Sequence, residues 1–164
     1  MSTDVPWLSP GEQHEWRALV ALLMTLPAAM DAQLKRDAGV NNFEYHLLAR
    51  LSMAPGRALV LSELAWQAQG SLSRLSHAIT RLERAGWVER RACNDKGRRV
   101  EAHLTDAGMA KVEAMAPGHV REARRLVVDV LTPGQLAALG EAARAITAVT
   151  MADDPGACPE LADC

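Results

Sequence analysis

The sequence GSLSRLSHAITRLER, residues 70–84, predicts a helix with two opposed faces. At about 100° per residue, one face is apolar and carries Leu72, Leu75, Ile79 and Leu82. The other face is basic and carries Arg74, His77, Arg81 and Arg84, with Ser73, Ser76 and Thr80 beside them. The first face suits a hydrophobic core. The second suits the major groove of DNA, where cations meet phosphates and short polar groups meet base edges, although a solvated helix with ordinary surface arginines has the same pattern.

The charge of the chain is concentrated around this helix. Residues 71–99 contain eight lysines and arginines against three acids, a local charge of +5. The rest of the chain contains ten against seventeen, a charge of −7, so the net charge of −2 conceals a positive patch. Such a patch is the electrostatic footprint of a nucleic-acid-binding protein. A helical protein-interaction module or a small enzyme does not need it.

The flanking segments complete a winged helix-turn-helix pattern. Upstream, residues 59–61 suit a minimal strand, and Ser62 is the expected N-cap of a short helix that ends at Gln69-Gly70. Ser71 is then the expected cap of the basic helix, and Gly86 its C-terminal stop. Downstream, residues 87–91 and 100–104 predict a β-hairpin whose tip is basic and carries Lys96, Arg98 and Arg99.

At this point the sequence resembles the MarR family of winged helix-turn-helix regulators. The resemblance spans residues 44–108 and rests on Glu44-Tyr45, on Ser62-Glu63-Leu64-Ala65, on RLERAGWVER at 81–90, where the family typically has RLExxGLVxR, and on LTxxG at 104–108. The flanking helices extend it to roughly residues 12–150. In two places the chain departs from the family pattern: an acid common in the family is replaced by Thr80, and Asp95 is separated from Arg98-Arg99 by two residues.

The resemblance implies a homodimeric repressor that reads a palindromic operator and is released by a small aromatic or anionic effector. Within the basic helix we expect Ser73, Arg74, Ser76 and His77 to reach bases, and Arg81 and Arg84 to contact phosphate. Arg98 and Arg99 would anchor the wing. The complete predicted DNA-binding set is Ser62, Ser71, Ser73, Arg74, Ser76, His77, Thr80, Arg81, Arg84, Lys96, Arg98 and Arg99.

Long apolar helices are predicted at both ends of the chain. Ser9-Pro10 can start the first, and an apolar seam then runs through Trp16, Leu19, Leu23, Leu26 and Met30, with a kink expected at Pro27. Thr132-Pro133 can start the last, after a helical stretch over 106–131 with an expected break at Pro117-Gly118. These seams favour a dimer, although an intrachain bundle would also bury them. The residues assigned to dimerisation are Leu19, Leu26, Leu136, Leu139 and Ile146.

The resemblance places an effector pocket between these helices and the winged domain. Its candidate residues are Trp16, Arg17, Leu23, Pro27, Met30, Tyr45, His46 and Trp66, for most of which plain core packing is the simpler interpretation. His46 or Arg17 would pair with an anionic effector.

Other functions have less support in the sequence. We expect no metal site and no cofactor, because the five histidines have no ligand spacing and no Cys-x-x-Cys pair occurs among Cys93, Cys158 and Cys164. Cys93 lies near Arg90 and Arg91, so a cysteine-responsive or metal-responsive regulator stays an alternative. Enzyme motifs are absent, as are a signal peptide and a membrane-spanning run, so we expect a non-enzymatic cytoplasmic protein.

The predicted fold is mainly α with a small β-hairpin. It consists of a winged helix-turn-helix domain over 38–105 and a helical dimerisation region over 10–37 and 106–150, with flexible tails at 1–9 and 151–164.

Overall fold

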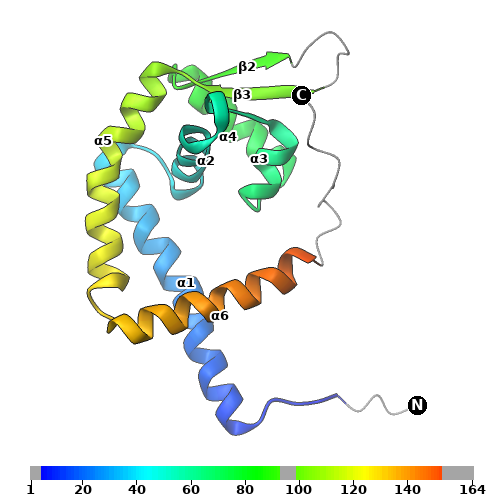
Figure 1. Cartoon of the computed structure of the whole chain (residues 1–164), viewed down its shortest axis with the longest axis vertical. Coiled ribbons are helices and arrows are strands. Elements are labelled where there is room, and N and C mark those ends of the chain that lie inside the picture. The colour runs from blue at the N-terminus through cyan, green and yellow to red at the C-terminus, as the bar shows by residue number, and fades with distance from the viewer. Residues whose placement is uncertain (1–4, 93–98, 153–164) are drawn as a thin grey trace.

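The computed structural model describes residues 5–92 and 99–152 and shows a mainly helical chain around one small sheet (Figure 1). The sheet is antiparallel with strand order β1-β3-β2. This arrangement confirms the predicted winged helix fold. In chain order the elements are α1 (Pro10–Ala38), α2 (Asn42–Met53), η1 (Pro55–Arg57), β1 (Ala58–Val60), α3 (Leu61–Gln67), α4 (Leu72–Arg84), β2 (Val88–Ala92), β3 (Val100–Leu104), α5 (Asp106–Ala123), η2 (Arg124–Val128) and α6 (Pro133–Ala152).

The hydrophobic core lies where α2, α3 and α4 meet the sheet. α2 contributes three of its fully buried leucines, Leu47, Leu48 and Leu51. The buried face of α4 consists of Leu75, Ala78, Ile79 and Leu82. Leu72 is 63% exposed, so its prediction as a core residue is wrong. The centre of the buried face runs along Leu75, Ala78 and Leu82, and at about 100° per residue Leu72 falls at its edge, in the first turn.

Local capping explains where most helices begin. The hydroxyl of Ser9 accepts from the Glu12 amide, and the hydroxyl of Ser71 accepts from the Arg74 amide, as the sequence predicted. The predicted cap at Ser62 is wrong. β1 passes into α3 without an intervening residue, so the helix begins at Leu61 with Val60 at the N-cap position and Ser62 already in the first turn.

The wing is joined to α5 through a close backbone contact. Thr105 caps α5 by accepting from the Gly108 amide, and its hydroxyl donates to the Gly86 carbonyl at 2.7 Å. Its amide donates to the Trp87 carbonyl at 3.0 Å. A β-carbon added to Gly108 would lie 2.1 Å from that same Trp87 oxygen. The LTxxG segment therefore needs glycine at its last position because backbone occupies the space of a side chain.

The helix α5 runs through Pro117 without interruption, so the predicted break at Pro117-Gly118 is wrong. α5 packs along α1, and a β-carbon at Gly118 would lie 3.2 Å from Nε2 of Gln33 on α1. This tertiary packing holds the helix together across the proline, whose helix-breaking tendency is only local. The chain then passes through the π-helical turn η2 and enters α6 at Pro133, where the Thr132 hydroxyl accepts from the Gln135 amide as expected of a cap.

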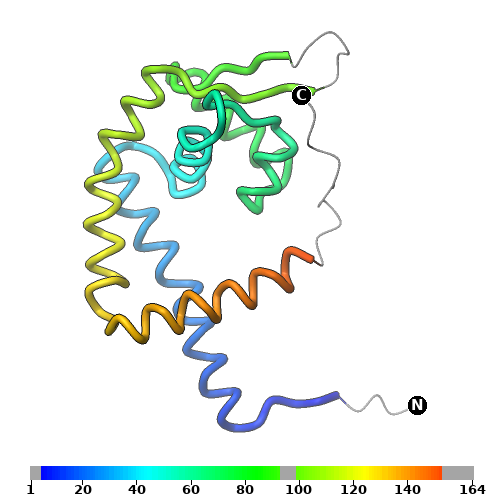
Figure 2. The backbone as a smooth tube through the Cα atoms, viewed as in Figure 1, coloured from blue at the N-terminus to red at the C-terminus, as the bar shows by residue number. Residues whose placement is uncertain are grey.

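The terminal helices extend away from the winged domain. The backbone trace shows α5 leading down beside α1, and α6 turning from the end of α5 across the lower part of the molecule (Figure 2). No residue of α6 is buried, and α6 extends to Ala152, two residues into the predicted tail. Residues 153–164, with Cys158 and Cys164, lie outside the described residues.

The sequence predicted no segment able to cross a membrane. This prediction is wrong, because α1 is long and apolar enough to do so by length and composition. α1 has 29 residues and contains a window of 18 residues with a mean hydropathy of 1.3. Polar residues such as Thr25 and Asp31 interrupt the apolar residues of this helix, so it contains no unbroken apolar run of that length. By itself this property is weak evidence for a membrane span, because the apolar face of a helix that packs against protein has it too.

Replacing Gly108 by alanine is expected to destabilise the fold by about 3 kcal/mol, because the new methyl group collides with the Trp87 carbonyl and backbone must move. Urea unfolding followed by circular dichroism measures this change. Gly11→Ala is the matched control, since a β-carbon there has no atom within 4 Å. Equal stability of the two variants would contradict the proposed close contact.

Candidate nucleic-acid interface

The outward surface of α4 is a polar ridge. Ser73, Ser76, His77 and Arg84 are all exposed, opposite the buried leucines of the same helix. Their spacing along the helix aligns Ser73, His77 and Arg84 on nearly one line. The ridge is therefore formed by hydroxyl, imidazole and guanidinium groups with solvent in front of them.

Two arginines of α4 lean toward α2 and away from the ridge. The guanidinium of Arg74 lies 4.2 Å from the centre of the Phe43 ring, a cation–π contact. Nη2 of Arg81 lies 2.6 Å from Oε1 of Glu44. The sequence did not predict either contact, because Phe43 and Glu44 lie far upstream of α4 along the chain. Both residues stand at the start of α2, which the fold brings beside α4.

The other side of α4 is tied to the wing. Arg90 on β2 pairs with Glu83, and its amide donates to Oε1 of Glu83 at 3.0 Å. Its guanidinium also donates to the Ser76 carbonyl and to the Thr80 hydroxyl, at 3.0 and 3.2 Å. At Thr80, where the family commonly has an acid, the hydroxyl accepts from Arg90, and the acid that pairs with this wing arginine is Glu83. Arg90 therefore contacts Ser76, Thr80 and Glu83, and these contacts hold the wing against α4.

The tip of the wing is described only in part. Lys96, Arg98 and Cys93 lie outside the described residues. Arg99 is exposed immediately before β3. Of the other predicted DNA-binding residues, Ser62 is exposed in the first turn of α3, Ser71 caps α4, and Thr80 is half-buried under Arg90.

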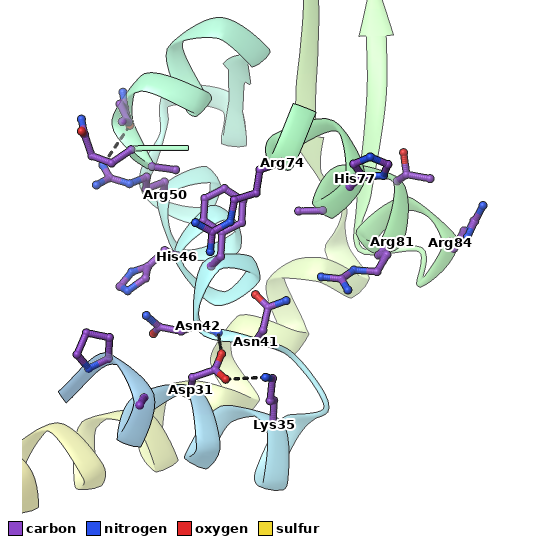
Figure 3. Close-up of a pocket in the computed structure, with 18 residues that line it drawn as sticks. Asp31, Lys35, Asn41, Asn42, His46, Arg50, Arg74, His77, Arg81 and Arg84 are labelled. Carbon is purple, nitrogen blue, oxygen red and sulfur yellow. Dashed lines mark hydrogen bonds and ion pairs between the residues drawn. The ribbon is translucent and has the colours of Figure 1, made fainter. Parts of the chain in front are cut away.

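A groove of about 1380 Å³ separates α4 from α1 and the start of α2 (Figure 3). Among its lining residues, Asp31 is the only acid. The bases and histidines lining it are Lys35, His46, Arg50, Arg74, His77, Arg81 and Arg84. The groove is therefore strongly positive and opens onto the same arginines that flank the ridge.

The structure does not bring the eight predicted effector residues together. Pro27 and His46 line the groove. Trp16, Arg17 and Leu23 are exposed on the N-terminal half of α1, and Met30 is half-buried further along it. Tyr45 is buried and does not line the groove, and its ring lies 4.1 Å from that of His119. Trp66 is half-buried in α3, and its buried indole N–H has no partner among the described residues.

His46 and His119 lie on either side of Tyr45. Burial lowers the pKa of His46, and the charge of Arg50 lowers it further. Burial also lowers the pKa of His119, with a smaller contribution from His46. Nδ1 of His119 is buried without a partner in the described part of the chain. The sequence did not predict the contact between His119 and Tyr45, because His119 follows the expected break at Pro117-Gly118.

Within residues 5–92 and 99–152, no group of three histidine, cysteine or acidic side chains is arranged to hold a metal ion.

The fold and the polar recognition helix define the class of winged helix-turn-helix proteins. A model of the MarR family matches residues 40–100. Sco3205, a MarR family transcriptional regulator from Streptomyces coelicolor solved in complex with DNA, is 43% identical over 89% of this chain and 91% of its own, with a TM-score of 0.84. AbsC, another from the same organism, is 33% identical over 91% of this chain and 100% of its own, with a TM-score of 0.85. The chain belongs to the MarR family.

A more distant structure shares the fold. A mutant of MarR from E. coli, complexed with operator DNA, is 22% identical over 81% of this chain and 96% of its own, with a TM-score of 0.68. No curated protein matches the sequence.

Acidification is expected to destabilise the fold through His46 and His119. Both have a pKa below the ordinary 6.5, so the unfolded chain binds protons more readily, and the free energy of unfolding falls as the pH drops through about 6.5. The His46→Asn/His119→Asn double variant is expected to lose part of the difference between denaturant unfolding at about pH 7.5 and about pH 5.5. His77→Asn, on α4 and outside the Tyr45 cluster, is the control and should keep the wild-type difference. A double variant as pH-dependent as wild type would contradict the assignment.

Proposed function

We propose that this protein is a sequence-specific DNA-binding transcriptional repressor that acts as a homodimer on a palindromic operator. The observation that carries the proposal is the exposed polar ridge of α4, held between Arg90 on one side and Phe43 and Glu44 on the other. A helix with its apolar side buried and such a ridge exposed can enter the major groove. The DNA complex of the 43% identical Sco3205 supports the same use of the fold.

The proposed dimer rests on apolar side chains that a single chain leaves in solvent. Leu23 is 60% exposed on α1 and Ile146 is 51% exposed on α6. Leu139 is exposed as well, while Leu19, Leu26 and Leu136 are half-buried. Apolar surface of this extent on two long helices calls for a partner. A second copy would cover it, and two-fold symmetry would then present two α4 helices to half-sites about 34 Å apart.

The proposed effector is a small anionic molecule that binds the groove between α1, α2 and α4. Lys35, His46 and Arg50 offer it positive or hydrogen-bonding groups, with Pro27 as an apolar contact. A ligand there would touch both α1 and the recognition helix, and could change how the two are placed. We place the protein in the cytoplasm, where its operator is.

The first test is fluorescence anisotropy with duplexes that tile the intergenic region beside the gene, at about 150 mM salt with competitor DNA. The proposal expects saturable, palindrome-dependent binding at nanomolar concentration. Weak binding without sequence preference, lost at modest salt, would contradict it and favour a helical interaction module.

Arg84→Ala is expected to lower the slope of log K against log salt by about one, because one phosphate contact is lost. Titrations of one operator duplex at several salt concentrations measure the slope. Glu141→Ala is the control: it removes a charge from α6, away from α4, and should leave the slope unchanged. An unchanged slope in Arg84→Ala would remove Arg84 from the interface.

Ile146→Glu is expected to convert the dimer to monomers and to weaken operator binding at least tenfold, because a charge enters the apolar interface. Light scattering coupled to size exclusion measures the mass. Met53→Glu, at an exposed apolar position on α2, is the matched control and should stay dimeric. A dimeric Ile146→Glu would place the interface elsewhere.

A further inference from the structure

We propose that Glu44 is a positioning residue for the recognition helix, and that Arg81 supports DNA binding by holding Glu44 and not by contacting phosphate. The inference rests on the proposed DNA-binding function. It reverses the sequence-based assignment of Arg81 as a phosphate contact.

The carboxylate of Glu44 is almost completely withdrawn from water. Its side chain is 8% exposed, and both oxygens are engaged: Oε1 lies 2.6 Å from Nη2 of Arg81, and Oε2 accepts from the Asn41 amide at 2.9 Å. The Glu44 amide in turn donates to the Asn41 side chain, which closes a capping box at the start of α2. A buried carboxylate depends on its countercharge far more than an exposed one does.

The same turn is tied to α1 on its other side. The Asn42 amide donates to Oδ1 of Asp31 at 2.8 Å, and Oδ2 of Asp31 lies 2.7 Å from Nζ of Lys35 (Figure 3). Adjacent amides of the Asn41-Asn42 turn thus bind one carboxylate from α2 and one from α1. Through Glu44 and Arg81, the first of these ties reaches α4. The turn therefore connects the N-terminal helix to the recognition helix by charged hydrogen bonds.

The direction of Arg81 fits a positioning role. Arg74 and Arg81 lie seven residues apart, on one line of the helix that faces α2, and both have partners there. Arg84 lies on the outward ridge, and no partner for it is found among the described residues. If Arg81 turned to a phosphate, it would leave Glu44 buried without a countercharge. A phosphate contact at an exposed helix does not compensate that loss.

The test compares Arg81→Ala, Glu44→Gln and their double variant on one operator duplex over a range of salt. We expect each single variant to bind the operator about tenfold more weakly than wild type, with an unchanged salt slope. We expect the double variant to bind the operator no more weakly than either single variant, because each single variant already breaks the same ion pair. Arg84→Ala is the comparison, with its slope lowered by about one. A slope lowered in Arg81→Ala, or tighter operator binding by Glu44→Gln, would overturn the proposal.

A second measurement needs no DNA. Amide hydrogen exchange along the C-terminal half of α4 is expected to be about tenfold faster in Arg81→Ala than in wild type, because the tie to α2 is lost. Arg84→Ala should exchange like wild type, and equal exchange in all three proteins would overturn the proposal. Arg81 is 59% exposed, so this variant should fold even where Glu44→Gln does not. If wild type binds no duplex, the proposed function fails, while the exchange data still decide the role of the pair.

Discussion

Burial of one side of α4 is the constraint on which the rest of the interface depends. Once Leu75, Ala78, Ile79 and Leu82 enter the core, the rotation of the helix about its axis is fixed. The ridge must then face solvent, and the two remaining flanks must face α2 and the wing. Each flank has an acid to receive a base, Glu44 for Arg81 and Glu83 for Arg90. Hydrophobic burial sets the orientation of the helix, and the ion pairs connect its two flanks to α2 and to the wing.

The sequence predicted those features that arise within one element. The two faces of α4, its cap at Ser71 and the strands of the wing all follow from spacing and from residues a few positions apart. The predictions were wrong where contacts with other elements determine burial or helix length. Leu72 has core spacing but lies where the core ends. Pro117 usually ends a helix, but here it lies in a helix that packs along α1.

The partners of the basic residues could not be predicted in this way. The sequence alone does not distinguish Arg74, Arg81 and Arg90. In the fold, Arg74 lies over an aromatic ring, Arg81 pairs with a buried carboxylate, and Arg90 donates to oxygen atoms of α4. These contacts join residues from 7 to 37 positions apart. A count of positive charges therefore overstates how many of them are available to an anion. In the described part of α4, Arg84 combines positive charge with a position on the ridge.

The short connections of the winged domain have a consequence for evolution and engineering. β1 passes directly into α3, and one residue, Thr105, joins β3 to α5. Thr105 is also fixed by hydrogen bonds to Gly86 and Trp87, so little slack separates α5 from the base of the wing. Insertions of even one residue at these two junctions would rotate the following helix by about 100° and bury the wrong face. An insertion at 129–132, between η2 and α6, would leave the core of the chain intact, because no residue of the following helix is buried there, but it would rotate the apolar face of α6 that carries Ile146.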